Sequence, residues 1–146
     1  MSENELSQKN RADYHCFFPI GTRWGDNDIY GHVNNVVYYA YFDSVANQFL
    51  IEQGGLDIHH SDTIGLVVNS QCSYFAPVEF PDSLQGGFRV NRLGSSSVEY
   101  GIAIFKEGEE SAVAAGTFTH VFVNRDSRRP TPIEGKMREA LTKASL

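Results

Sequence analysis

Cysteine is scarce in this chain, and no long apolar run occurs. Only Cys16 and Cys72 are present, far apart and without CxxC spacing, so we expect neither a disulfide framework nor a thiolate zinc site. No segment approaches the roughly 20 apolar residues that span a bilayer, and the polar N-terminal stretch lacks the apolar core of a signal sequence. The sequence therefore predicts a protein of a reduced, cytoplasmic compartment without a membrane segment.

An excess of basic charge is also lacking. The chain has 12 Lys and Arg against 18 Asp and Glu, and the net charge of -6 argues against nucleic acid as the main partner. There is no G-x-S-x-G nucleophile elbow, no P-loop and no dinucleotide-binding glycine pattern. Serine-based hydrolysis and nucleotide-fuelled chemistry are not expected, and no cofactor is predicted.

What the chain does have is enough apolar material for one core. Hydrophobic residues make up 41% of its 146 residues, which suits a single domain. Residues 1–13 lack hydrophobic periodicity and are predicted to be a disordered or loosely attached lead-in. Residues 14–146 are then expected to form the domain.

Hydrophobic spacing predicts one long helix followed by a change of period. The helix has Asn34 or Asn35 as a natural N-cap and stops at Gly54 and Gly55. Its apolar positions follow the i, i+3, i+4, i+7 spacing, at Tyr38, Tyr41, Phe42, Val45, Ala46, Phe49 and Leu50. Strands are predicted over 14–24, 64–76, 83–93, 98–106 and 111–124, and a short terminal helix over 133–144.

The order of these elements indicates the fold class. Short polar turns between the later strands imply antiparallel neighbours. One strand, one strongly apolar helix and then four strands make an α+β domain in which a single sheet must cover most of the helix. We therefore expect an antiparallel sheet of about five strands curled around a long central helix.

The segment from Arg23 to Tyr39 concentrates polar residues where the first strand gives way to the helix. It contains Asp26, Asp28, His32, Asn34 and Asn35. A helix N-terminus presents free backbone N–H groups and a partial positive charge, so it can stabilise a carboxylate or an oxyanion developing on a carbonyl. A structural interpretation stays open beside this one, because Asp and Asn also favour turns and helix caps.

Metal binding by this segment does not fit the spacing. The Asp26-x-Asp28 pair resembles the start of a calcium-binding EF-hand loop, but Tyr30 stands at the third ligand position and Val37 where the terminal Glu is needed. Asp26, Asp28 and His32 also lack a recognised transition-metal spacing. The sequence therefore predicts no metal site.

Read as a whole, the segment resembles a known family signature. The run Trp24-Gly-Asp-Asn-Asp28-x-x-Gly31-His32-Val33-Asn34-Asn35-x-x-Tyr38 is similar to that of the 4-hydroxybenzoyl-CoA thioesterase group of hotdog-fold proteins. The resemblance covers nearly the whole chain, since that group also has a first strand, a long helix and then the rest of an antiparallel sheet. It implies a hotdog fold and an enzyme that hydrolyses an acyl thioester, an acyl-CoA foremost.

The resemblance also implies residue roles. Asp28 would be the catalytic carboxylate, acting as nucleophile or as general base toward water, and the backbone N–H of Asn35 would polarise the thioester carbonyl. His32 is a further catalytic candidate that could orient substrate or water. Gly31 would allow close approach of the chain, and Asn34 would help to orient the substrate. Tyr38 is also expected in the substrate-binding site.

The carrier and the assembly follow from the same resemblance. The tail that contains Arg128 and Arg129 resembles the arginine and proline segment of the group, and these two residues are expected to bind the phosphates of CoA. Hotdog domains usually pair through their sheets, which implies a homodimer or homotetramer. An acyl-carrier protein stays open as the carrier. A non-catalytic acyl-binding module and a hotdog hydratase or dehydratase remain alternative interpretations.

Overall fold

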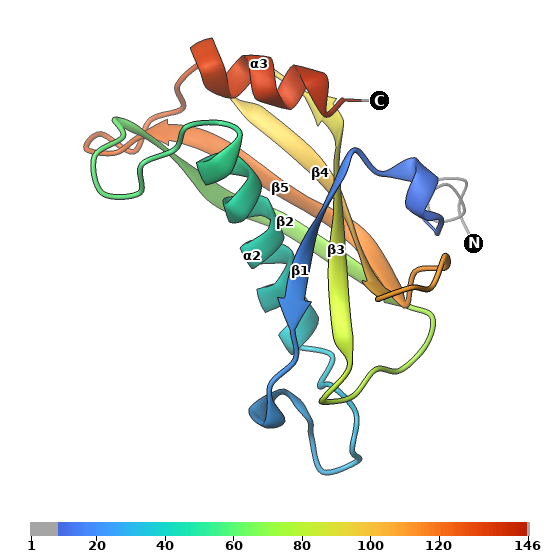
Figure 1. The fold of residues 1–146 in the computed structure, drawn as a ribbon. Helices are drawn as coiled ribbons and strands as arrows, with labels where there is room; N and C mark the ends of the chain where they lie inside the picture. Colours follow the sequence, from blue (N-terminus) through green and yellow to red (C-terminus); the bar gives the residue numbers. More distant parts are fainter. Residues whose placement is uncertain (1–8, 146) are drawn as a thin grey trace.

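A computed structural model describes residues 9–145 of the chain. Its centre is one five-stranded antiparallel sheet in the order β1-β3-β4-β5-β2, with helix α2 lying against one face (Figure 1). The elements are β1 (Cys16–Gly21), α2 (Val37–Glu52), β2 (Thr63–Tyr74), β3 (Ser83–Leu93), β4 (Ser97–Lys106), β5 (Ala114–Asn124) and α3 (Gly135–Lys143). The predicted α+β fold, a sheet wrapped around a long helix, is confirmed.

The apolar stripe of α2 forms the centre of the core. All seven apolar positions that define its predicted face are buried. Phe49 stacks on Phe88 of β3 with ring centroids 4.2 Å apart, and Gly86 leaves room for the side chain of Val45. Because a Cβ at position 86 would overlap Val45, this glycine lets the helix approach the sheet closely.

The element boundaries differ from the predicted ones mainly at the ends. The first strand stops at Gly21, and Trp24–Asp26 forms a 3₁₀ turn instead of its continuation. Helix α2 begins at Val37, and no side chain caps it directly. Asn34 still serves the preceding turn, because its Oδ1 accepts the N–H of Val36 at 3.0 Å. The predicted asparagine cap therefore lies before the helix proper.

The expected loose lead-in is wrong for residues 9–13. Arg11 donates to Gln85 Oε1 at 2.7 Å and to the carbonyls of Glu109 and Lys106 at 2.6 and 3.0 Å. These contacts fix the segment on the sheet, because one guanidinium offers several donors in a rigid fork. Residues 1–8, the rest of the expected lead-in, lie outside the described part of the chain.

Strand β2 is an edge strand with unusual exposure. Every residue from 66 to 71 is exposed, including Leu66, Val67 and Val68. Along its paired strand β5, Tyr74 lies opposite Ala114 and Thr63 opposite Asn124. The two ends of β2 therefore mark opposite ends of the sheet. Within residues 9–145, no helix is long and apolar enough to cross a membrane.

Candidate active site

The loop before α2 is folded tightly around Asp28. The backbone N–H of Asp28 donates to the carbonyl of His32, and the N–H of Gly31 donates to the carbonyl of Asp28, both at 3.0 Å. Gly31 has φ +86°, a left-handed conformation that favours glycine. The carboxylate of Asp28 accepts the N–H of Tyr30 at 2.9 Å and remains partly exposed. The loop thus offers Asp28 to an incoming ligand.

Asp26, two residues earlier, has a different environment. Its side chain is 2% exposed, and Oδ2 accepts the hydroxyl of Tyr41 at 2.7 Å and the N–H of Arg23 at 2.9 Å. Its backbone carbonyl accepts the N–H of Asn34 at 2.9 Å. Asp26 therefore joins the loop to the helix, and its buried oxygens are taken by protein donors.

The entry to α2 leaves one backbone donor free. Among the described residues, no acceptor lies within hydrogen-bond geometry of the Asn35 N–H. The carbonyl of Asn35 accepts the hydroxyl of Tyr74 at 2.9 Å. A free N–H at a helix N-terminus is suited to bind an anion or a polarised carbonyl oxygen.

Two open hollows are lined by residues of the loop and of the helix entry. One of about 780 Å³ contains Asp28, Gly31 and Asn34 among its lining residues. The other, of about 330 Å³, is lined by His32, Val33, Asn35, Tyr38, Tyr74, Phe75, Ala76 and Pro77. The predicted site residues of the loop and helix all line one or other of these hollows, but Asp28 and Asn35 line different ones.

Two tyrosines, the buried Tyr38 and the 43% exposed Tyr74, form the aromatic wall of the smaller hollow. Tyr38 is 3% exposed and lies edge-on to Tyr74, with ring centroids 5.1 Å apart, and to Tyr41 at 6.0 Å. Burial raises the pKa of Tyr38 to about 12, with a smaller contribution from Cys72. The hydroxyl is therefore neutral at ordinary pH, and the wall is apolar with a polar tip.

Arg128 and Arg129 are not brought to this site within one chain. Both are exposed and follow β5, which ends at Asn124. Asn124 pairs with Thr63 at the first end of β2, whereas the site adjoins Tyr74 at the last end of β2. The ten steps from Ala114 to Asn124 correspond to about 33 Å of strand. Within one chain these arginines therefore lie away from Asp28, and their binding of CoA phosphates stays a prediction.

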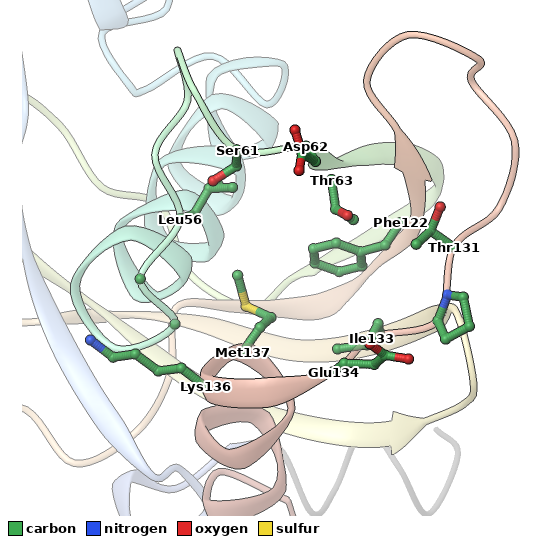
Figure 2. Close-up of a pocket in the computed structure, with 13 residues that line it drawn as sticks. Leu56, Ser61, Asp62, Thr63, Phe122, Thr131, Ile133, Glu134, Lys136 and Met137 are labelled. Carbon is green, nitrogen blue, oxygen red and sulfur yellow. The ribbon is translucent and has the colours of Figure 1, made fainter.

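A further cavity of about 340 Å³ lies at the far end of α2 (Figure 2). Its apolar side chains include Leu56 of the loop after α2, Phe122 of β5, Ile133 of the segment before α3 and Met137 of α3. Asp62, Glu134 and Lys136 are among its polar residues. None of the predicted site residues lines it. Among the described residues, no group of three or more His, Cys, Asp or Glu side chains could hold a metal ion.

Sequence reasoning missed Tyr74 as a residue of the site. It sits at the end of a predicted strand, and nothing in the local pattern says that its hydroxyl reaches the helix entry 39 residues earlier. The role of Tyr41 beyond the core was missed for the same reason, because the pattern shows only that it faces inward. The available signal was indirect: buried tyrosines usually find a partner for the hydroxyl.

The fold and the helix-entry site define the class of hotdog-fold thioesterases. The family model of the thioesterase-like superfamily matches residues 22–141, and the chain belongs to this family. The match includes the loop of Asp28, helix α2 and the whole of strands β2 to β5. Family membership supports thioester hydrolysis as the reaction class.

Two solved structures share the fold, and one further relative matches in sequence. The PA5185 protein of Pseudomonas aeruginosa is 57% identical, with a TM-score of 0.92 over 93% of this chain and 95% of that chain. Slr0204 of Synechocystis, a 1,4-dihydroxy-2-naphthoyl-CoA thioesterase, is 15% identical, with a TM-score of 0.77 over 86% and 94% of the two chains, and shows the fold alone. The uncharacterized protein YsmA of Bacillus subtilis is 25% identical over 62% of this chain, and the match spans 61% of its own length.

Proposed function

We propose that this protein hydrolyses an acyl-CoA to the free acid and the CoA thiol. The observation that carries the proposal is the unoccupied Asn35 N–H at the entry of α2, one short loop away from the partly exposed carboxylate of Asp28. An oxyanion donor and a carboxylate are sufficient for a thioester, because a thiolate leaves readily without much protonation. CoA is the proposed carrier, and an acyl-carrier protein is the alternative.

In the general-base form of the reaction, Asp28 takes a proton from water as the water oxygen attacks the carbonyl carbon. The carbonyl oxygen gains negative charge, which the N–H of Asn35 stabilises. The C–S bond then breaks, and the CoA thiolate leaves and takes up a proton. In the nucleophilic form, the Asp28 carboxylate attacks the carbonyl carbon and the CoA thiolate leaves as the C–S bond breaks. Water then hydrolyses the mixed anhydride and returns the free acid and the Asp28 carboxylate. His32 and Asn34 would orient water or substrate, while Gly31 and Tyr38 would shape the place of the acyl group.

The decisive experiment is thiol release from short, long and aromatic acyl-CoAs by wild type and Asp28→Asn. We expect the variant to lose a hundredfold or more in turnover, about 2.7 kcal/mol of barrier. Asp43→Asn is the matched control, because Asp43 is an exposed acid on α2 whose side chain accepts a hydrogen bond from Asn47 at 3.0 Å. Activity that survives in Asp28→Asn would remove Asp28 from the mechanism.

Other outcomes separate the alternative functions. A wild type that binds acyl-CoA but releases no thiol from any of them favours a non-catalytic acyl-binding module. Hydration of an enoyl-CoA without thiol release favours a hydratase. Both outcomes would contradict the proposed hydrolysis.

We further propose that two copies pair through β2. The exposed run 66–71 is centred between Val68 and Asn69, and an edge with exposed apolar residues is a template for strand pairing. Antiparallel pairing about that centre sets Thr63 of one copy opposite Tyr74 of the other, since both residues are equally far from it. Arg128 and Arg129 of one copy, which follow β5 beside Thr63, would then come toward the helix entry of the second copy and could bind CoA phosphates there.

Sedimentation of wild type and Val68→Asp tests this pairing. We expect a dimer, or a tetramer built from dimers, for wild type and a shift toward monomer for the variant, because the pairing would take a carboxylate out of water at the centre of the edge, opposite Asn69 of the second copy. Ile51→Asp is the matched control, since Ile51 is 44% exposed on α2 and not on the edge strand. A monomeric wild type would contradict the proposal. So would a variant that stays dimeric.

We also propose a cytoplasmic location. The free cysteines Cys16 and Cys72 agree with it.

A further inference from the structure

Neither the backbone N–H nor the backbone carbonyl of Asn35 takes part in the backbone hydrogen bonds of helix α2. The turn before the helix closes with short-range bonds, from the N–H of Val37 to the carbonyl of Asn34 at 2.9 Å and from the N–H of Tyr39 to the carbonyl of Val36 at 3.2 Å. These bonds bypass Asn35, so its N–H has no acceptor among the described residues and no backbone donor reaches its carbonyl. The N–H of Asn35 shares a planar peptide with the carbonyl of Asn34, which the turn holds through the N–H of Val37. On the other side, no backbone bond of the helix holds the carbonyl of Asn35.

Tyr74 supplies the contact that the helix does not. Its hydroxyl donates to the Asn35 carbonyl at 2.9 Å, from the end of β2. The edge-on contact with Tyr38, which is itself buried, holds the ring in place. Burial, followed by the neighbouring Cys72 and Tyr39, raises the pKa of Tyr74 well above its ordinary value, so the hydroxyl remains a donor at every working pH.

We infer that Tyr74 is a positioning residue for the oxyanion donor of the proposed hydrolysis, and this inference rests on that proposed function. An oxyanion donor is effective only when it is held within a narrow range of position and angle before the charge develops. Asn35 lies at a helix entry without a side-chain cap, where chain ends ordinarily fray. The Tyr74 hydroxyl ties the Asn35 carbonyl to the end of β2, so it fixes the position of the helix entry beside the N–H and limits rotation about the backbone of Asn35.

Tyr74→Phe isolates the role, because it removes the hydroxyl and keeps the ring. We expect kcat to fall about tenfold with KM within about twofold, since the lost order affects a group needed mainly in the transition state. The matched control is Tyr100→Phe. Tyr100 lies on β4, and its buried hydroxyl bonds His120 Nδ1 at 3.0 Å, well inside the core. We expect this control to lower the melting temperature and leave kcat unchanged.

A second measurement reads the position of Asn35 without any reaction. The backbone ¹⁵N order parameter of Asn35 is expected to fall in Tyr74→Phe and to stay at its wild-type value in Tyr100→Phe. An unchanged Asn35 amide in Tyr74→Phe overturns the inference, even if kcat falls, because Tyr74 would then act through another group. An unchanged kcat in an active enzyme overturns it as well. If wild type releases no thiol, the proposed function fails, and the amide measurement alone decides whether Tyr74 orders Asn35.

Discussion

Substitution of Asp26 and of Asp28, which are separated by one residue, should have very different effects on the free energy of unfolding. Asp26 is buried and accepts two protein donors with one oxygen, whereas Asp28 is partly exposed and accepts one exposed N–H. We expect Asp26→Ala to lower the free energy of unfolding strongly and Asp28→Ala to affect it little. The contrast tests the assignment of one acid to the fold and the other to the chemistry.

The magnitude follows from the contacts of Asp26. A hydrogen bond to a charged group contributes about 1.5–3 kcal/mol, and the variant also leaves the buried hydroxyl of Tyr41 without its acceptor. The ion pair with Arg23 adds little, because the Arg23 side chain is 83% exposed. The total is about 3 kcal/mol, which lowers the melting temperature by roughly 6–12 °C in a chain of this size. For Asp28→Ala the loss should stay within about 1 kcal/mol, since water can replace the carboxylate at the exposed N–H of Tyr30.

Thermal and urea unfolding of both variants, alongside thiol release at a temperature where both are folded, measures the two effects. Asp26→Ala should retain measurable turnover once folded, and Asp28→Ala should not. Equal destabilisation by the two substitutions would refute the reasoning. A larger loss of stability in Asp28→Ala would do the same.

Two further expectations concern the core. Burial lowers the pKa of His120 to about 4 from 6.5, so between these pH values the unfolded chain binds a proton that the native chain does not. Wild type should therefore lose stability, about 3 kcal/mol from this group, as pH falls from 6.5 toward 4. His120→Gln should show a smaller loss in urea unfolding at pH 7 and 4.5, and equal losses would contradict the cause. Gly86→Ala should destabilise by about 1–3 kcal/mol, because its Cβ would overlap Val45, and an unchanged melting temperature would show that α2 can shift away from β3.

Hydrophobic spacing was sufficient to predict the main elements. The helical stripe predicted every buried position of α2, because a helix packed on one sheet must turn the same face inward along its length. The errors lie at the ends, as with the first strand, where Trp24–Asp26 turns away from the sheet. End positions depend on which backbone groups find partners, and those partners are distant in the sequence. Arg11 shows the same effect, since its acceptors are 74 to 98 residues away.

The candidate site was predictable only in part for a similar reason. Spacing alone could not distinguish Asp26 from Asp28, and the resemblance to the family supplied that choice. The structure adds a physical basis, because only Asp26 has its oxygens taken by Tyr41 and Arg23. The bond from Tyr74 to Asn35 could not be predicted, since it depends on how far β2 extends toward the helix entry.

The position of the two arginines points to a property of the assembly. Arg128 and Arg129 lie at one end of the sheet and Asp28 at the other. A CoA bound at Asp28 would therefore have to run the length of a strand to reach the arginines of the same chain. An edge strand with three exposed apolar side chains is a liability for aggregation unless something covers it. Antiparallel pairing of that edge with its own copy would cover it and, by the same rotation, bring the arginines of each subunit to the helix entry of the other. Val68→Asp should therefore weaken binding of CoA as well as assembly, whereas removal of the two arginines should weaken binding alone.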